Sequence, residues 1–391
     1  MYITIILVLI DISATFGTID HRILLDRLEN WFGVTGPALC WFQSYLNRRT
    51  QSVVVEDSQS EPKVLSYGVP QGSVLGPILF NCYIAPLASV VSQHGVEKHT
   101  YAGDNQLYLA IELKSPTDVD CAIDQLESCI ECVRTWMRKN WLQLNDDKTE
   151  VLVFASSHKL KQLQRMTPNM CIAIGDKHIQ LSQSVRNLGI IQDSELQMDQ
   201  HVTHVIKQCN LQLSRNISRI HRYLTMEATK SIVHALVTSR LDYGNALLFG
   251  ISGKQLCRLQ KIQNCAARLI AKIPRTHHIS PVLVQLHWLP VHRRIEFKIL
   301  VHTYRALNDT APQYLSQLIV PYTPTRALRS QEARLLTVPR RKKVSFVMRA
   351  FSAAAPKLWN ALPGYLRCAP SLESFKKSLK HHLFVTEYNT D

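Results

Sequence analysis

Residues 2–12 read YITIILVLIDI, a nearly unbroken apolar run, rich in β-branched side chains, in which Asp11 is the one charged residue. Such a run predicts a buried central strand over Tyr2–Ile12. It is far shorter than the ~20 residues that cross a bilayer, and it has neither a basic flank nor a small-residue cleavage site. We therefore expect no signal peptide, no membrane anchor and no membrane partner.

A pair of strands is predicted at Lys98–Ala102 and Gln106–Ile111, and the tight-turn signal Gly103-Asp104-Asn105 joins them. Asp11 would end its strand and Asp104 would lie on this turn, so strand pairing would bring the two carboxylates within a few ångströms. Convergent carboxylates can hold two Mg²⁺ ions ~3.5–4 Å apart, which activate a hydroxyl and stabilise a pyrophosphate leaving group. An aspartate at a strand end or a turn is also commonplace, and spacing alone does not choose between the two interpretations.

The order of the predicted elements divides the chain. Strands and helices alternate up to about residue 195, and the pattern beyond is helical, with prolines breaking short helices after residue 275. This order indicates an α/β catalytic-type body over 1–195, then a helical basic region over 196–275 and an irregular C-terminal region over 276–391. The other predicted helices are Asp20–Phe32, Pro37–Asn47, Val74–Ser92, Thr117–Trp141, Asp199–Tyr223, Met226–Tyr243, Lys254–Ala271 and Ser371–Phe384, and the other predicted strands are Thr50–Glu56, Lys63–Tyr67, Glu150–Ala155, Cys171–Ile174 and His178–Leu181.

Charge is unevenly distributed along the 391 residues. Residues 201–391 hold 29 Lys+Arg against 8 Asp+Glu, a net charge of +21, whereas residues 1–200 hold 16 against 22, a net charge of −6. A basic half indicates a polyanionic partner, nucleic acid first. The run Arg340–Lys343 is a nuclear localisation patch or a phosphate contact, and the sequence does not separate the two.

The remaining motifs exclude several classes of protein. Ten scattered cysteines favour a reducing, intracellular setting over a secreted disulfide scaffold, with nucleus or cytoplasm left open. The chain has no P-loop, G-x-G-x-x-G turn, G-x-S-x-G elbow or H-E-x-x-H helix. Nucleotide hydrolysis on a P-loop, dinucleotide binding, serine hydrolysis and zinc proteolysis are therefore not expected.

Five segments occur in a fixed order: LVLIDISATFGTIDH (7–21), YGVPQGSVLGPILFNCYI (67–84), TYAGDNQLYLAI (100–111), WMRKNWLQLNDDKTEVLVF (136–154) and SVRNLGIIQDSELQM (184–198). Together they resemble the successive palm motifs of reverse transcriptases from non-LTR (LINE-type) retrotransposons, nearest the jockey-like and chicken-repeat-like groups. The tail resembles the same lineage, notably SRLDYGNALLFGIS (239–252), LHWLPVHRRIEFKILVHTYRALN (286–308) and FSAAAPKLWNALP (351–363).

This resemblance implies the α+β fold class, with a right-hand polymerase palm over 1–195 in which helices pack on an antiparallel sheet and most of the fingers are lacking. A helical thumb-like region over 196–275 and the irregular, basic C-terminal region of a retroelement protein over 276–391 would follow. It implies an RNA-directed DNA polymerase that extends a DNA primer on an RNA template with deoxynucleoside triphosphates and Mg²⁺. The oligomeric state is not implied. A group II intron-type polymerase is a weaker alternative, because the tail matches the LINE-type lineage.

The resemblance assigns the catalytic roles. Asp11 matches the first metal-binding carboxylate, Asp104 a second, and Lys148 the lysine proposed to protonate the leaving pyrophosphate. A solvated surface lysine is the alternative for Lys148.

Binding roles follow in the same way. Phe16 matches the aromatic residue that selects deoxynucleotides, with a core phenylalanine as the alternative, and Gln71 and Gly72 match the loop that lines the nucleotide pocket, with a helix-entry turn as the alternative. Leu188 and Gly189 match the turn that grips the primer, with an ordinary β-turn as the alternative.

The sequence departs from the family at points that bear on activity. The hairpin reads Tyr101-Ala102-Gly103-Asp104 where the family has Tyr-Ala-Asp-Asp, so Gly103 replaces a metal ligand, and Gly17 replaces the aspartate that usually follows the aromatic. Met1 lies inside the first palm strand, so we expect a chain truncated at its N-terminus that lacks the fingers and the upstream endonuclease. The expected polymerase is catalytically impaired or inactive, and the alternatives are a non-catalytic nucleic-acid-binding protein and a functionless element remnant.

Overall fold

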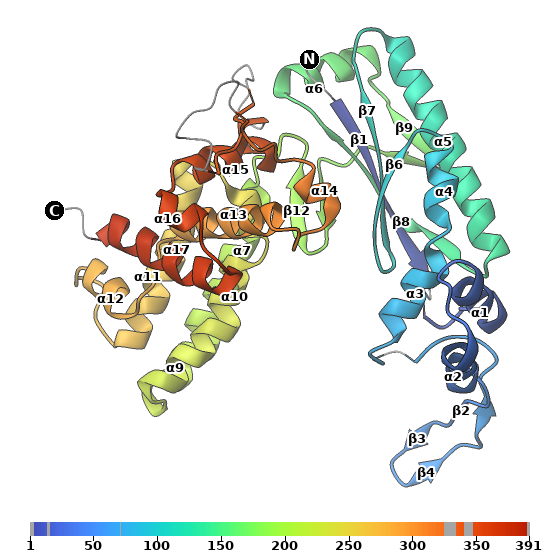
Figure 1. Ribbon diagram of the computed structural model, residues 1–391, viewed down its shortest axis with the longest axis horizontal. Helices are drawn as coiled ribbons and strands as arrows, with labels where there is room; N and C mark the ends of the chain where they lie inside the picture. The colour runs from blue at the N-terminus through green and yellow to red at the C-terminus, as the bar shows by residue number, and fades with distance from the viewer. Residues whose placement is uncertain (1–3, 14–15, 71, 324–333, 340–346, 389–391) are drawn as a thin grey trace. The chain divides into compact units, whose positions relative to one another are not determined.

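A four-stranded antiparallel sheet forms the centre of the N-terminal half in the computed structural model, which describes residues 4–13, 16–70, 72–323, 334–339 and 347–388 (Figure 1). The strand order is β6-β7-β1-β8. The strands span β1 Thr4–Ser13, β6 Glu97–Tyr101, β7 Asp104–Ile111 and β8 Gln143–Phe154. The apolar strand β1 therefore lies between β7 and β8, as its composition predicts.

The two faces of β1 have different environments. Ile6, Val8, Ile10 and Ile12 are buried in the main core, because alternate side chains of a strand point to the same face. Asp11 has the opposite parity and lies on the other face, where it lines a pocket. The pairing of β1 with β7 runs in continuous register from Thr4 opposite Ile111 to Asp11 opposite Asp104.

Helices cover the core face of the sheet, as Figure 1 shows for α4 and α5. Helices α1 and α5 begin at capping side chains: the Asp20 carboxylate accepts hydrogen bonds from the first backbone amides of α1, and Ser115 and Asp118 form a capping box at α5. The helices of this half are α1 His21–Asn30, α2 Gly36–Leu46, α3 Gly76–Ile84, α4 Leu87–Ser92, α5 Pro116–Lys139 and α6 Ser157–Met166.

Short antiparallel pairs complete the N-terminal half. Two of them, β2 with β5 and β3 with β4, follow α2, and the hairpins β9–β10 and β11–β12 follow α6. Their bounds are β2 Thr50–Gln51, β3 Val54–Val55, β4 Ser58–Gln59, β5 Lys63–Val64, β9 Cys171–Ile174, β10 Lys177–Gln180, β11 Ser184–Asn187 and β12 Ile190–Asp193.

The chain divides into two compact units, Met1–Glu195 and Leu196–Asp391. The second unit is helical, and two of its long helices each contain a π-helical stretch, Gln212–Ile217 after α7 and His234–Thr238 after α9. Its helices are α7 Asp199–Leu211, α8 Ser218–Ile220, α9 Met226–Val233, α10 Ser239–Asp242, α11 Gly253–Ala271, α12 Ser280–Gln285, α13 Val291–Leu307, α14 Gln313–Ser316, α15 Phe351–Asn360, α16 Gly364–Arg367 and α17 Leu372–Tyr388, with 3₁₀ turns at His221–Tyr223, Asn245–Leu248 and Val347–Arg349.

The last third of the chain has a core of its own. Tyr304 of α13 stacks on Phe375 of α17 with ring centroids 4.5 Å apart, and Trp359 of α15 packs on the same phenylalanine. Arg294 of α13 donates to Asp242 of α10 at 2.8 Å. Residue 275, after which the sequence predicts a division, therefore lies inside the second unit. The hydrogen bond between Arg294 and Asp242 joins α13 to α10 across that position.

Antiparallel strands and segregated helices confirm the α+β class. The predicted helix over 74–92 is two helices, because the chain breaks at Ala85-Pro86. The strand predicted at Glu150 begins seven residues earlier, at Gln143, and the predicted strand over 50–56 is two short pieces. The expectation of short helices after residue 275 is wrong for α13, because most of the prolines fall between helices rather than inside them, whereas the helix predicted at Ser371–Phe384 is observed as α17.

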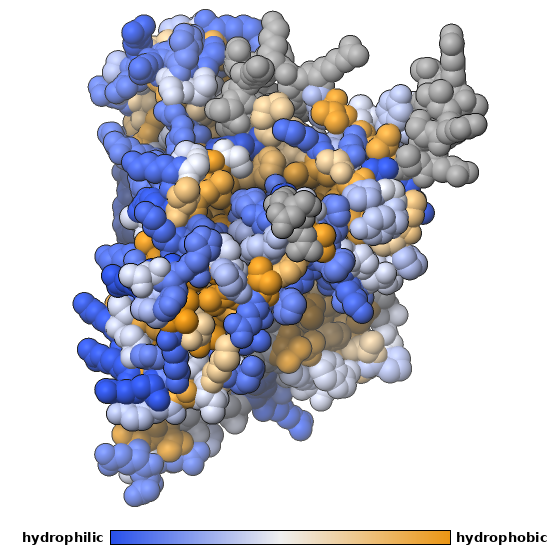
Figure 2. Space-filling model, turned by 90° about the vertical axis from the view of Figure 1, so that its left-hand side faces the viewer, coloured by the Kyte–Doolittle hydropathy of each residue, from blue (hydrophilic) through white to orange (hydrophobic). Residues whose placement is uncertain are grey.

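The surface of the molecule seen in Figure 2 is largely hydrophilic, with apolar side chains gathered in patches and hollows. Within the described ranges, none of the helices combines the length and the apolar character that a bilayer-crossing helix requires. The Arg340–Lys343 run lies outside the described residues.

Candidate active site

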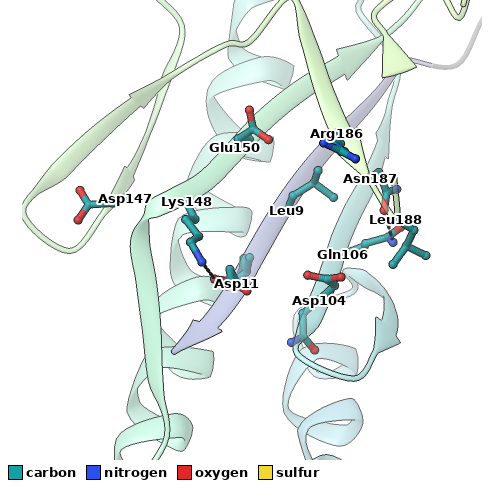
Figure 3. A pocket seen from close by; sticks show the side chains of 12 residues that line it. Leu9, Asp11, Asp104, Gln106, Asp147, Lys148, Glu150, Arg186, Asn187 and Leu188 are labelled. Atoms are coloured by element: carbon teal, nitrogen blue, oxygen red, sulfur yellow. Dashed lines mark hydrogen bonds and ion pairs between the residues drawn. The ribbon is translucent and has the colours of Figure 1, made fainter. Parts of the chain in front are cut away.

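Asp11 and Asp104 face each other across neighbouring strands. They are direct partners in the β1–β7 register, and both line a pocket of about 440 Å³ on the face of the sheet opposite the helices (Figure 3). Directly paired antiparallel residues have Cα atoms ~4.5–5.5 Å apart, which is close enough for two carboxylates to share one cation. The predicted approach of these two side chains is therefore what the structure shows.

The turn that carries Asp104 is a two-residue hairpin loop. Tyr101 pairs with Asp104, so Ala102 and Gly103 are its two central residues, and Ala102 has a left-handed backbone with φ 51°. The buried Asn105 side chain supports the turn, since its amide donates to the Gly103 carbonyl at 3.1 Å and its oxygen accepts from Thr100 at 3.1 Å. Position 103 thus lies beside Asp104 at the tip of a well-supported turn, but it has no side chain to offer the pocket.

Lys148 reaches Asp11 because β8 bulges beside it. Leu9 pairs with Glu150 and Asp11 pairs with Asn145, so two steps along β1 correspond to five along β8. The extra residues place the Lys148 ammonium 3.1 Å from the Asp11 Oδ2 atom (Figure 3). A regular strand would not have produced this contact.

Two ion pairs hold the part of the bulge that directly precedes Lys148. Arg134 of α5 makes two hydrogen bonds to Asp146, at 2.8 and 3.1 Å, and Lys177 of β10 pairs with Asp147. The hydrogen bond from Lys177 lowers the pKa of the Asp147 carboxyl. Asp146 and Asp147 are each paired with another cation, and Asp11 is the carboxylate that Lys148 contacts.

A second two-residue turn borders the pocket. Asn187 pairs with Ile190, so Leu188 and Gly189 are the central residues of the β11–β12 hairpin, with φ 46° and 82°. Leu188 lines the pocket, and the Gln106 amide on β7 donates to the Asn187 side-chain oxygen at 2.8 Å. The hydrogen bond ties this turn to the strand that begins with Asp104.

The remaining predicted site residues lie elsewhere. Phe16 does not line the pocket but packs on Phe80 with centroids 5.5 Å apart. Its carbonyl accepts from the Val69 amide at 2.8 Å, so it borders the loop that leads to Gly72. Gly72 is exposed with φ 81° and does not line the pocket, and Gln71 lies outside the described residues.

Sequence reasoning missed several pocket residues. Glu150, Arg186 and Asn187 line the pocket together with the carboxylates. Arg186 and Asn187 directly precede the predicted Leu188–Gly189 turn, so their proximity could have been inferred from that motif. Glu150 could not, because its place depends on the bulge in β8.

The residues present fit one magnesium ion but not a dense carboxylate cluster. Mg²⁺ in enzymes is commonly held by one or two carboxylates together with waters and substrate phosphates, and Asp11 and Asp104 provide such a pair. Across the described residues, no group of three or more His, Cys, Asp or Glu side chains is arranged to hold a metal ion. The missing third ligand agrees with glycine at position 103.

Comparison with known proteins relates the chain to a family. Residues 4–192 match the family model described as reverse transcriptase (RNA-dependent DNA polymerase). The probable RNA-directed DNA polymerase from transposon BS of Drosophila melanogaster is 28% identical over 330 residues, which cover 82% of this chain and 34% of that protein. The RNA-directed DNA polymerase from the mobile element jockey of the same species is 26% identical over 273 residues, 68% of this chain and 28% of that protein.

The chain thus spans about a third of the length of these relatives. Among solved structures, telomerase from Candida albicans, in complex with a fragment of telomeric RNA, matches with 12% identity and a TM-score of 0.35 over 73% of this chain and 51% of that one. A score this low supports no further conclusion.

Proposed function

Since residues 4–192 belong to the reverse transcriptase family of non-LTR retrotransposons, we propose that the N-terminal unit is the palm of an RNA-directed DNA polymerase. The observation that carries this proposal is the pairing of Asp11 with Asp104 beside Lys148 in one pocket. The proposed substrates are a DNA primer with a free 3′-hydroxyl, an RNA template and deoxynucleoside triphosphates.

The two carboxylates would hold Mg²⁺. When bound, the ion lowers the pKa of the primer hydroxyl and neutralises charge on the triphosphate. Lys148 lies within reach of the same carboxylate and would neutralise or protonate the departing pyrophosphate, as a positioned general acid does. Leu188 and Gly189, on the turn that borders the pocket, would support the primer end.

Nucleotide selection would involve residues that do not line this pocket. We assign Phe16 to deoxynucleotide selection and Gln71 and Gly72 to the nucleotide loop. The support is indirect: the Phe16 carbonyl and the loop before Gly72 are joined by a backbone hydrogen bond. The aromatic residue and the loop therefore form one local structure that begins five residues after Asp11.

We further propose that Gly103 impairs this polymerase. The turn keeps its hairpin geometry, with Asp104 in register, but one carboxylate of the family pattern is absent. Charge stabilisation by each metal ion is worth several kcal/mol in the transition state, so a lost ligand reduces the rate strongly. A second candidate function is nucleic-acid binding without catalysis, and the basic C-terminal half favours it.

The second unit would hold the nucleic acid. We assign its first part to a thumb-like region and the remainder to the basic tail of a retroelement protein. The net charge of +21 over residues 201–391 supports contact with phosphates rather than with base edges. Binding through such a surface should weaken steeply with added salt, because counterions are released on association.

Primer extension on an RNA template with Mg²⁺ tests the proposal. We would compare the natural chain, Gly103→Asp, and Gly103→Asp combined with Asp11→Asn. We expect weak or undetectable extension by the natural chain, a clear gain with Gly103→Asp and none with the double variant. Robust extension by the natural chain would overturn the impairment, and extension that survives Asp11→Asn would overturn the assigned site.

A further inference from the structure

Helix α2 is apolar but largely uncovered. Its sequence, GPALCWFQSYL, contains no charged residue, yet Leu46 is its one buried side chain within the described part of the chain. Leu39, Phe42 and Tyr45 are partly buried against the core, whereas Trp41 beside them is exposed. In Figure 1 it lies between α1 and the β2–β5 segment at one end of the N-terminal unit. Its outer face therefore calls for a ligand or partner.

Planar side chains form a ladder on this helix. Trp41 and Tyr45, one helical turn apart, stack with centroids 5.3 Å apart and planes 11° from parallel. The Arg49 guanidinium lies 5.4 Å from the centroid of the same tyrosine ring. Trp41 remains 53% exposed. A large aromatic ring with one face occupied and more than half its side chain in water is a platform on which another flat group can stack.

The charge around the ladder selects the kind of ligand. From Trp31 to Val55 the chain contains Arg48 and Arg49 and no aspartate or glutamate. The N-terminal half as a whole is acidic, so this stretch is a local exception. Flat groups linked by phosphates fit both features, since bases stack on aromatic rings and phosphates pair with arginine.

We propose that the Trp41–Tyr45–Arg49 ladder binds unpaired bases of single-stranded nucleic acid. Trp41 stacks on one base, and Arg48 and Arg49 contact the adjoining phosphates. None of these residues lines the carboxylate pocket, so the ladder is a second nucleic-acid contact on the same unit. The inference does not require the proposed polymerase activity.

Binding of a labelled oligoadenylate RNA to the full chain tests this inference. A strand of abasic nucleotides of the same length serves as the comparison, because it keeps the phosphates and lacks the bases. Stacking on an aromatic side chain is worth about 1–3 kcal/mol per base, which corresponds to about a 5- to 150-fold change in affinity. We therefore expect Trp41→Ala to weaken oligoadenylate binding by a factor in this range and to leave binding of the abasic strand unchanged.

Further variants separate stacking from charge and from folding. Arg49→Lys keeps the charge but loses the flat guanidinium, and we expect it to weaken oligoadenylate more than the abasic strand. Trp141→Ala is the matched control, since Trp141 is also exposed on this unit, at 64%, but is not part of the ladder. We expect it to bind like the natural chain. Both substituted tryptophans are exposed, so thermal unfolding should be little changed.

Two outcomes would overturn the inference. One is oligoadenylate binding by Trp41→Ala at the strength of the natural chain. The other is a natural chain that sediments as a dimer, which Trp41→Ala dissociates without a change in oligoadenylate affinity, because α2 would then be covered by a second copy. Neither measurement involves primer extension, so failure of the polymerase proposal would not be confused with failure of this one.

Discussion

The β6–β7 and β11–β12 hairpins border the same pocket, and each has a two-residue turn. The two turns differ in what their glycine means for the chemistry of the pocket. In each, the first central residue has a left-handed backbone, at φ 51° in Ala102 and 46° in Leu188, and the second is glycine. Glycine at 189 has φ 82°, where a side chain is strained, so its presence has a conformational cause. Glycine at 103 stands where the resemblance to the family leads us to expect a metal-binding aspartate.

The same residue type therefore has different consequences in the two turns. Glycine satisfies the backbone conformation at position 189, whereas at position 103 it leaves the pocket without a carboxylate. Gly103, unlike Gly189, does not have a positive φ, so this two-residue turn does not by itself require glycine at position 103. The hairpin keeps its register and its Asn105 support without that carboxylate. At position 103 the hairpin geometry therefore does not depend on which residue supplies the chemistry. At position 189 we expect the hairpin geometry to depend on glycine.

Metal affinity should show the largest effect. We expect Gly103→Asp to tighten Mn²⁺ binding to the full chain by about tenfold or more, ~1.4 kcal/mol, because a third carboxylate joins Asp11 and Asp104. Isothermal titration calorimetry or the electron paramagnetic resonance signal of Mn²⁺ would measure this affinity. Gly189→Asp is the matched control, since it adds the same charge to the other turn. An equal gain from both variants would show that net charge, rather than a completed ligand set, is responsible.

The stability of the protein should depend on glycine at position 189 of the β11–β12 turn. Gly189→Ala should lower the free energy of unfolding by about 1–2 kcal/mol, the cost of left-handed backbone in a residue with a Cβ atom. Gly189→Asn should lose less, because asparagine visits this region more readily. Urea denaturation would compare the two. A loss as large in Gly189→Asn as in Gly189→Ala would point to crowding rather than to backbone strain.

The two hairpins are also coupled. The hydrogen bond from Gln106 to Asn187 links them at 2.8 Å, and a bond of this kind contributes about 0.5–1.5 kcal/mol. A double-mutant cycle with Gln106→Leu and Asn187→Leu should return a coupling energy in that range. Additive effects of the two substitutions would mean that the hairpins border the pocket independently.

How far the sequence predicts this site depends on the kind of signal. The approach of Asp11 to Asp104 follows from an apolar strand and a turn signal, both of which are local patterns that the sheet preserves. The contact of Lys148 with Asp11 depends on extra residues in β8, and no periodicity marks a bulge whose anchors, Arg134 and Lys177, are distant in sequence. The roles of the site residues remain predictions.

The fold was predictable to a similar degree. The paired hairpin strands were close to their observed bounds because alternation and Gly-Asp turn signals are short-range. The core around Tyr304, Trp359 and Phe375 was not, because proline content suggested irregular structure and hid the length of α13. The exposed position of α2 was also hidden, since an apolar sequence predicts burial.

The smallest expected effect concerns a lysine that only the first hairpin contains. Lys98 lies on β6, opposite Leu107, whereas β11 and β12 contain no lysine. Burial lowers the pKa of Lys98 to about 8. The unfolded chain therefore holds this proton more tightly, and between pH 8 and the ordinary lysine value of ~10.4 the protein should gain stability as pH rises. Below pH 8 both states are protonated, and the cost of burying the ammonium group is fully present.

Lys98→Met should therefore melt at a higher temperature than the natural chain at pH 7, and the difference should shrink as pH rises through 8 towards 10. Lys63→Met, at an exposed lysine of the same unit, should show no such trend. A Lys98→Met difference that stays constant from pH 7 to 10 would mean that methionine packs better in the hairpin and that the burial of charge has no part in it.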